Sequence, residues 1–232
     1  AGEMRQTQGK VTLASSTAVC AQTAWIQSTT IRNNIVFGNV FDPERYRYVL
    51  EKCCLLPDLA TLAEGDQTIV GEKGVSLSGG QKQRLNIARA LYHNSEIVLL
   101  DDCLSALDAR VGADIFANVI AGPAMQGKAR LLVTHSLNVL RSCDWIVYMA
   151  NGRIAEQGTY DELVGSKSRV AELILKHTKD KNDQSKDEVG ESSEGDPDAR
   201  AGSSLGSHPE DNLARLREDG GASSISSTVT MD

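Results

Sequence analysis

Leu77–Gln81 reads Leu-Ser-Gly-Gly-Gln, with its serine and glutamine three positions apart. Ser78 at an N-cap with Gln81 at the third helical position makes a capping box, which predicts a helix from Ser78 to about His93. Glycine is a poor helix former, so the two glycines in the first turn need a further reason. They leave backbone N–H groups uncovered at the positive end of the helix dipole, where a phosphate group can dock. The plain alternative is a well-capped helix with no ligand.

The apolar run Ile97–Leu100 comes next and ends in two acidic residues, Asp101 and Asp102. A continuous apolar run predicts a strand that is buried on both faces, as in a parallel sheet. Ligands of such sheets bind at the carboxyl ends of the strands. We therefore expect Asp101 to hold Mg²⁺ through its carboxylate. Asp102 falls where a general base for an attacking water would stand, and its plain alternative is a surface acid.

Three more polar residues stand at the ends of predicted elements. His135 follows the apolar strand Arg130–Val133, where an imidazole can hydrogen-bond a γ-phosphate and hold the attacking water in line. Gln22 follows the strand Ala18–Cys20, and we interpret it as a hinge that senses Mg²⁺. Asp108 precedes a predicted helix, which it is also suited to cap.

Strands alternate with helices along the chain, which predicts an α/β fold with a mostly parallel sheet. The predicted strands are Gly9–Leu13, Ala18–Cys20, Ile97–Leu100, Arg130–Val133, Trp145–Met149 and Arg153–Glu156. The predicted helices run from Pro43 to about Cys54, from Pro57, from Ser78 to about His93, over Ala109–Ile120, after the capping box at Thr159, and over Val170–Lys176. The insertion between Gln22 and Ile97 is too long for one crossover, so we expect a helical subdomain at about residues 29–93.

Charge divides the chain in two. Lys179–Asp232 carries thirteen acidic and six basic residues, which accounts for the whole net charge of −7. The neutral remainder argues against nucleic acid as a partner, since phosphate binding leaves a basic footprint. The segment 179–232 is rich in Ser, Gly, Asp and Glu and is predicted to be a disordered acidic linker. The five cysteines show no metal-like spacing, and no apolar run is long enough to span a bilayer.

Together these motifs resemble the nucleotide-binding domain of ATP-binding cassette transporters, whose fold is a P-loop NTPase-like ATPase core with a helical subdomain. Leu77–Gln81 matches the family's LSGGQ signature without a change. Two stretches, Gln22–Gln27 and Ile31–Gly38, are similar to the C subfamily, the multidrug-resistance-associated exporters. The likeness covers about residues 1–178. The residues similar to the family's Q-loop, Walker B strand, D-loop and H-loop are Gln22, Ile97–Asp101, Ser105–Asp108 and His135.

The resemblance implies a role for each motif in binding and hydrolysing ATP with Mg²⁺. The implied catalytic residues are Asp102 and His135; the implied ATP-binding residues are Gln22, Ser78, Gly79, Gly80, Gln81 and Asp108; the implied Mg²⁺ ligands are Asp101 and Gln22. Family members bind ATP between two cassettes, each completing the other's site with its signature. The implied partners are therefore a second nucleotide-binding domain and the transmembrane domains of one exporter of organic solutes. The implied location is the cytoplasmic face of a plasma or vacuolar membrane.

Two departures from the family pattern stand out. The chain contains no G-x-x-x-x-G-K-[ST], the Walker A loop that cradles phosphates. Asp102 stands where most cassettes have Glu, a substitution typical of the first of two nucleotide-binding domains in the C subfamily. We expect a first domain without its Walker A, with residues 1–178 as the cassette, active as an ATPase in the whole transporter and inactive alone. Because Asp102 is one methylene short, slow hydrolysis at its own site is expected.

Two other functions are consistent with parts of this pattern. The chain could be a non-catalytic module that docks on another cassette and donates its signature without turning over ATP. It could also be a DNA-maintenance ATPase with the same signature, but such proteins split their head with a long coiled coil, and no heptad run occurs here.

Overall fold

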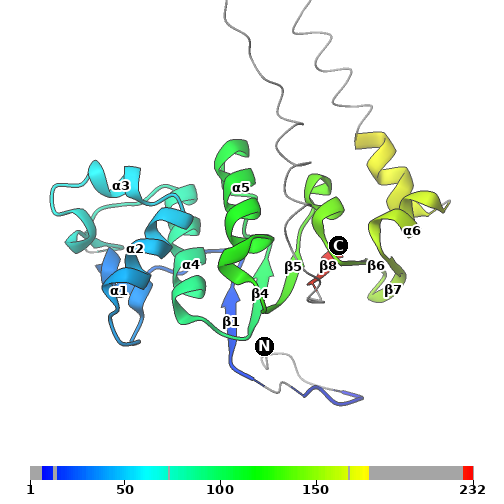
Figure 1. Cartoon of the computed structure of the whole chain (residues 1–232), viewed down its shortest axis with the longest axis horizontal. Helices are drawn as coiled ribbons and strands as arrows, with labels where there is room; N and C mark the ends of the chain where they lie inside the picture. Colours follow the sequence, from blue (N-terminus) through cyan, green and yellow to red (C-terminus); the bar gives the residue numbers. More distant parts are fainter. Residues whose placement is uncertain (1–6, 13–14, 73, 167, 178–226, 232) are drawn as a thin grey trace, which may run out of the picture. The chain divides into compact units, whose positions relative to one another are not determined.

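A computed structural model describes residues 7–12, 15–72, 74–166, 168–177 and 227–231 (Figure 1). Contacts divide the chain into one unit of residues 1–172 and 225–232 and a second of residues 173–224. Of the second unit, only residues 173–177 are described, and they are helical. The sheet, the helical part and the candidate site all lie in the first unit.

The core of this unit is a sheet with the strand order β1-β4-β5-β8-β6-β7. All neighbouring pairs are parallel except β6 and β7, which form an antiparallel hairpin. The strands are β1 (Thr17–Cys20), β4 (Ile97–Asp101), β5 (Ala129–Val133), β6 (Trp145–Ala150), β7 (Arg153–Gly158) and β8 (Ser227–Met231). The predicted α/β fold with a mostly parallel sheet is confirmed.

A helical part lies between β1 and β4 in the sequence. It comprises α1 (Ile31–Val36), α2 (Pro43–Lys52), α3 (Leu56–Ala60) and α4 (Gly79–His93), with a 3-10 turn, η1 (Gly65–Gln67), and a small antiparallel sheet of β2 (Thr29–Thr30) and β3 (Ile69–Val70). Asp42 caps α2 through two backbone N–H groups, and Pro43 occupies the first helical position, where its missing N–H costs nothing. Leu85, Ile87, Ala88 and Leu91 bury the inner face of α4, which anchors this helix to the rest of the unit.

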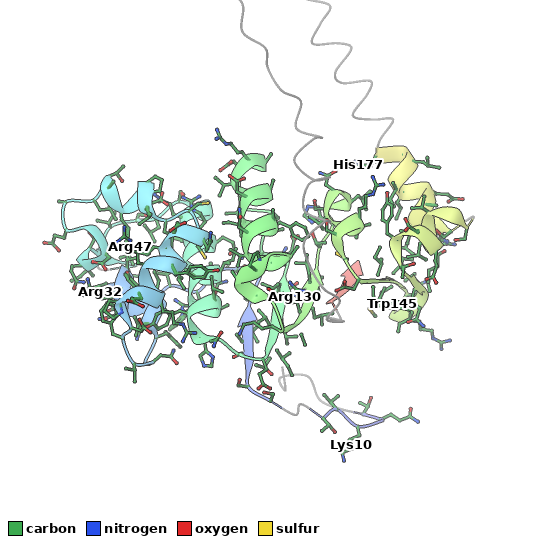
Figure 2. All side chains as sticks on the ribbon, viewed as in Figure 1. Lys10, Arg32, Arg47, Arg130, Trp145 and His177 are labelled. Carbon is green, nitrogen blue, oxygen red and sulfur yellow. The ribbon has the colours of Figure 1, made fainter. Side chains whose placement is uncertain are left out.

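The remaining helices follow β4, β5 and β7. They are α5 (Ala109–Ile115), which continues into the π-helical turn η2 (Phe116–Ile120), the short turns η3 (Pro123–Met125) and η4 (Leu137–Ser142), and α6 (Tyr160–Gly165). Thr159 caps α6 with the predicted capping box. Arg130, labelled in Figure 2, is buried in this region, and its Nη1 donates to the Ile120 carbonyl oxygen over 2.6 Å. Burial lowers the pKa of this guanidinium.

Two predictions about local structure were wrong. Gly9–Leu13 was predicted to be a strand, but the described residues 9–12 are irregular, because they pair with no neighbour in the described part of the sheet. The linker 179–232 was predicted to be disordered throughout, but Ser227–Met231 forms β8, which hydrogen-bonds to both β5 and β6. The rest of that predicted linker lies outside the described residues.

Candidate functional site

Three of the predicted site residues meet at the carboxyl end of the sheet. His135 Nδ1 lies 3.0 Å from Asp102 Oδ1. Gln22 Nε2 donates a long hydrogen bond of 3.4 Å to the other carboxylate oxygen, Oδ2. Gln22 follows β1, Asp102 follows β4, and His135 lies two residues beyond the end of β5. These strands are adjacent and parallel, so their carboxyl ends form one edge, where such sheets bind ligands.

Asp102 is held by its backbone as well as by its side chain. Its N–H donates to the Val133 carbonyl over 2.8 Å, which extends the pairing of β4 with β5 by one residue. Its own carbonyl accepts from the hydroxyl of Ser105 over 2.8 Å. Its φ is 41°, in the left-handed region, where Asp is tolerated better than most residues. Strained backbone of this kind gathers at functional sites, and here it turns the chain sharply out of the strand.

His135 and Asp102 differ in their exposure to solvent. The His135 side chain is 73% exposed, whereas that of Asp102 is 13% exposed. The carboxylate therefore lies at the base of the cluster and the imidazole at its rim. An incoming group would meet the imidazole first, while Asp102 holds the orientation of the ring.

Asp101 is the last residue of β4, and its side chain is exposed, with no hydrogen bond or ion pair among the described residues. Within those residues, no group of three or more His, Cys, Asp or Glu side chains could hold a metal ion by itself. Mg²⁺ is commonly bound by one or two carboxylates, with water and substrate phosphates completing the octahedron. The free Asp101 carboxylate and the Gln22 amide oxygen fit that pattern of shared ligation. In this structure the Gln22 amide group donates to Asp102, not to Asp101.

The predicted helix after Ser78 is present as α4, with both halves of the capping box formed. The Gln81 N–H donates to Ser78 Oγ over 3.2 Å, and the Ser78 N–H donates to Gln81 Oε1 over 2.9 Å. A Cβ added at Gly79 would meet no atom within 4 Å, so the backbone there is open to an incoming group. A Cβ added at Gly80 would lie 3.2 Å from the Ala106 carbonyl oxygen. The two positions therefore require glycine for different reasons. Gly79 keeps the backbone accessible, and Gly80 allows close packing against Ala106.

Asp108 caps α5, and its Oδ1 accepts from the Val111 N–H over 2.9 Å. This is the plain alternative that the sequence offered for Asp108. The segment between Asp102 and Asp108 passes the start of α4, since Ala106 lies against Gly80. The structure thus joins Asp102 and the open start of α4 through one short loop.

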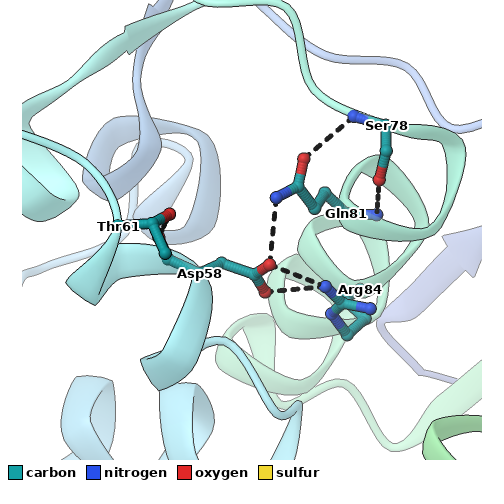
Figure 3. Close-up of polar contacts among 5 residues, drawn as sticks. All are labelled: Asp58, Thr61, Ser78, Gln81 and Arg84. Carbon is teal, nitrogen blue, oxygen red and sulfur yellow. Dashed lines mark hydrogen bonds and ion pairs between the residues drawn. The ribbon is translucent and has the colours of Figure 1, made fainter.

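Sequence reasoning missed two residues beside the signature helix, Asp58 and Arg84. Figure 3 shows that the Asp58 carboxylate accepts from both Gln81 and Arg84. Neither residue belongs to a short motif. The pairing joins segments that are more than twenty residues apart, for which a single sequence holds no signal.

An exposed apolar face lies on the helical part. Trp25, Phe37, Val40 and Phe41 are each more than 40% exposed, although large apolar side chains are usually buried. A hollow of about 390 Å³ opens beside them and is lined by Gln27, Thr29, Asn33, Val36, Phe37 and Gly38. Arg89 of α4 stacks on Trp25 and Phe37, at 5.5 Å and 4.8 Å from their ring centroids. Every helix among the described residues is too short or too polar to span a bilayer.

Comparison with known proteins gives consistent matches. Residues 1–105 match the model of the ABC transporter family. Over 188 residues the chain is 86% identical to the multidrug resistance protein fer6 of Mycosarcoma maydis, a match that covers 81% of this chain. It is 50% identical over 180 residues, or 78% of the chain, to the ABC-type transporter cicA of Emericella nidulans. It is also 50% identical over 182 residues, or 76% of the chain, to the human ATP-binding cassette sub-family C member 2. The matches span 14%, 13% and 12% of the lengths of these three relatives.

Proposed function

Because the chain belongs to the ABC transporter family, with multidrug resistance proteins of the C subfamily as its relatives, we propose that it is the first nucleotide-binding domain of such an exporter. In this role it binds and hydrolyses ATP together with a second cassette and couples hydrolysis to the export of organic solutes. Domains of this family are generally ATPases.

The observation that carries the proposal is the convergence of Gln22, Asp102 and His135 at one edge of the sheet. When bound there, ATP with Mg²⁺ supplies the phosphoryl group and the charge that must be neutralised. Asp101 is placed to hold the cation, since its carboxylate is exposed and unpaired among the described residues. Gln22 responds to the cation in this proposal, because its amide group donates to Asp102, the residue that follows Asp101.

Asp102 and His135 have different roles in hydrolysis, the first toward the attacking water and the second toward the outermost phosphate. Asp102 is placed to accept hydrogen bonds from the water and to orient it as a general base. His135 can donate from Nε2 toward the outermost phosphate when its ring carries both protons, because Asp102 accepts at Nδ1 and the exposed Nε2 is left for a ligand. Positioning of this kind, together with charge stabilisation, is the main source of catalysis in phosphoryl transfer.

The start of α4 serves a second ATP, bound by the partner cassette. Ser78 Oγ and the backbone N–H groups of Gly79 and Gly80 form an anion-binding helix end. The open space around Gly79 supports this role, because a phosphate can approach the backbone there without a side chain in the way.

The transmembrane part of the exporter is proposed to dock on the apolar face formed by Trp25, Phe37, Val40 and Phe41. Exposed apolar patches beside a hollow mark interaction sites. Trp25 lies three residues after Gln22 in the sequence. A change in the position of Gln22 can therefore reach this face through a short segment.

The test uses the transporter that contains this domain, reconstituted in membranes, with nucleotide trapping mapped separately at each ATP site. Ser78→Arg should reduce trapping and turnover at the partner's site by at least tenfold. Asp102→Asn should reduce hydrolysis at this domain's own site. Asp66→Asn, in an ion pair with Arg32, is the matched control and should change neither. If Asp102→Asn and His135→Ala change nothing while Ser78→Arg abolishes turnover, the chain is instead a non-catalytic module that only donates its signature. If none of these substitutions changes trapping or turnover, both proposed functions are wrong.

A further inference from the structure

The side chain of Gln81 is held at both ends by protein groups. Its Oε1 accepts from the Ser78 N–H over 2.9 Å, and its Nε2 donates to Asp58 Oδ1 over 3.0 Å (Figure 3). Only one of the two Nε2 hydrogens is used, but the amide is fixed in position between α3 and the start of α4. Both polar atoms of the Gln81 side chain therefore already have hydrogen-bond partners within the protein.

Asp58 is in turn fixed by Arg84, one turn further along α4. Arg84 Nη2 lies 2.9 Å from Asp58 Oδ1 and 2.7 Å from Oδ2. The side chains of Arg84 and Asp58 are only 12% and 19% exposed. A charge pair that is mostly withdrawn from water is costly to break by removing one partner. The ion pair with Arg84 therefore holds Asp58, the acceptor for Gln81, in a fixed position.

The hydrogen bonds among Asp58, Gln81 and Ser78 determine which backbone N–H groups at the start of α4 are left without an acceptor. The Ser78 N–H is used by Gln81 Oε1, and the Gln81 N–H is used by Ser78 Oγ. Among the described residues, no hydrogen bond takes up the N–H groups of Gly79 and Gly80. Asp58 keeps Gln81 in place, Gln81 closes the capping box, and the closed box leaves the two glycine N–H groups without an acceptor among the described residues.

We propose that Asp58 is a positioning residue for the nucleotide-binding end of α4, and that Gln81 acts as the link between them and not as a nucleotide ligand. This inference rests on the proposed function of Ser78 and the glycines as ligands of the partner's ATP. It differs from the role implied by resemblance alone, which counted Gln81 among the ATP-binding residues. The ligand whose binding depends on this positioning is an anion, the outermost phosphate of a nucleoside triphosphate.

The first test needs no nucleotide and uses the full chain. Asp58→Asn replaces one acceptor oxygen with an amide donor that faces Gln81 and Arg84. We expect amide hydrogen exchange at residues 79–82 to accelerate at least tenfold, while exchange in β4 stays within about twofold of the unchanged protein. Asp58→Glu, which keeps both acceptor oxygens, should restore most of the protection. Uniform acceleration across the sheet in Asp58→Asn, or none at residues 79–82, would overturn the inference. If Asp58→Asn does not fold, Asp58→Asn with Arg84→Gln removes both charges and carries the same test.

The second test separates a positioning role from direct contact with nucleotide. In the reconstituted transporter, Asp58→Asn and Gln81→Ala should each raise the KM for ATP about tenfold. Because both act through one network, the double variant should be no worse than either single one. Multiplication of the two effects would show that Asp58 and Gln81 act independently and not through one network, and would overturn the inference. Asp66→Asn again serves as the control, as a carboxylate paired with an arginine elsewhere in the helical part.

The two proposals fail in distinguishable ways. If Ser78→Arg leaves ATP turnover unchanged, the proposed function is wrong, whatever the exchange data show. If Ser78→Arg abolishes turnover at the partner's site while Asp58→Asn changes neither exchange nor KM, only the positioning role is wrong.

Discussion

The imidazole of His135 lies 3.0 Å from the carboxylate of Asp102, although the two residues follow different strands of the sheet. The Asp102 N–H donates to the carbonyl of Val133, the last residue of β5, so the backbone ladder fixes both residues. The pairing is therefore built into the register of β4 and β5. Chain geometry alone brings an acid and a base together at the ligand-binding edge.

The first prediction separates the activity of His135 from its contribution to stability. His135 is 73% exposed, so His135→Ala should change the free energy of unfolding by less than about 0.5 kcal/mol. Hydrolysis at this domain's own site should fall by at least tenfold in the transporter, because the water and outermost phosphate lose their partner. Urea denaturation of the chain and site-resolved nucleotide trapping measure the two effects. A large loss of stability with unchanged trapping would contradict the prediction. His177→Ala, a histidine in no cluster described above, is the control.

A second prediction concerns the length of the side chain at position 102. Asp102→Glu moves the carboxylate outward by one methylene, toward the place expected for the attacking water. Because a misplacement of ~1 Å can cost ~10²-fold in rate, hydrolysis at this site should rise, by up to that factor. The positive φ of 41° suits Asp better than Glu, so stability should fall slightly. Single-turnover hydrolysis and thermal unfolding test these opposite signs. Faster hydrolysis must disappear in Asp102→Gln, which has the same length and no basic oxygen pair.

How much of this could be predicted from the sequence depends on the range of each interaction. The α4 capping box, the Pro43 start of α2 and the buried strands β4, β5 and β6 were predictable, because their signals lie within one turn or one strand. The link from Asp58 to Gln81 was not, because it joins residues 23 positions apart and neither forms a motif with the other.

Strand pairing was predicted less well than the helices, for the same physical reason. The run Ser227–Met231 contains β-branched residues that favour a strand, but the acidic, Ser-rich surroundings outweighed that signal. Its two partners, β5 and β6, lie more than seventy residues earlier in the chain. Conversely, Gly9–Leu13 has strand-like residues, and its described part pairs with no strand. A strand is defined by its neighbours, which a local pattern does not identify.

The third prediction gives the two signature glycines opposite outcomes. Gly79→Ala places a methyl group in open space, so helix propensity should stabilise the chain by up to about 1 kcal/mol. The same methyl group should block anion approach and lower turnover at the partner's site. Gly80→Ala meets the Ala106 carbonyl oxygen at 3.2 Å, so it should lose that stability gain and shift the loop before Asp108. Chemical denaturation of both variants checks this. Equal stabilisation by both would contradict the packing role given to Gly80.

A fourth prediction tests the joint between α4 and α2. Tyr92 is 1% exposed; its hydroxyl donates to the Val40 carbonyl over 2.8 Å and accepts from the Asp42 N–H over 2.8 Å. Tyr92→Phe leaves both backbone groups without this partner and should cost about 1–3 kcal/mol of unfolding free energy. Tyr48→Phe on α2, 40% exposed, is the control and should cost less than about 0.5 kcal/mol. Equal costs for the two tyrosines would show that the buried hydroxyl contributes nothing.

The last prediction uses acid to remove a single ion pair. Arg32, labelled in Figure 2, donates from Nε to Asp66 Oδ2 over 2.8 Å and from Nη2 to Oδ1 over 3.1 Å. Partial burial raises the pKa of Asp66, but hydrogen bonds from Arg32 and Gln67 outweigh it, and the net pKa lies below the ordinary value. A carboxylate with a lowered pKa in the folded state contributes stability above its unfolded pKa and loses it as pH falls through the folded pKa.

Asp66→Asn should therefore destabilise the chain at pH 7 by about 0.5–1 kcal/mol, a modest value because the Arg32 side chain is 40% exposed to screening water. The difference between the two proteins should shrink below about pH 4, the usual range of an unfolded aspartate, since the protonated acid then resembles Asn. Urea denaturation of both proteins from pH 7 down to pH 3 measures it, with Asp114→Asn as the control for losing one negative charge. A difference that stays constant, or grows toward low pH, would mean that Arg32 does not hold Asp66 in its charged form.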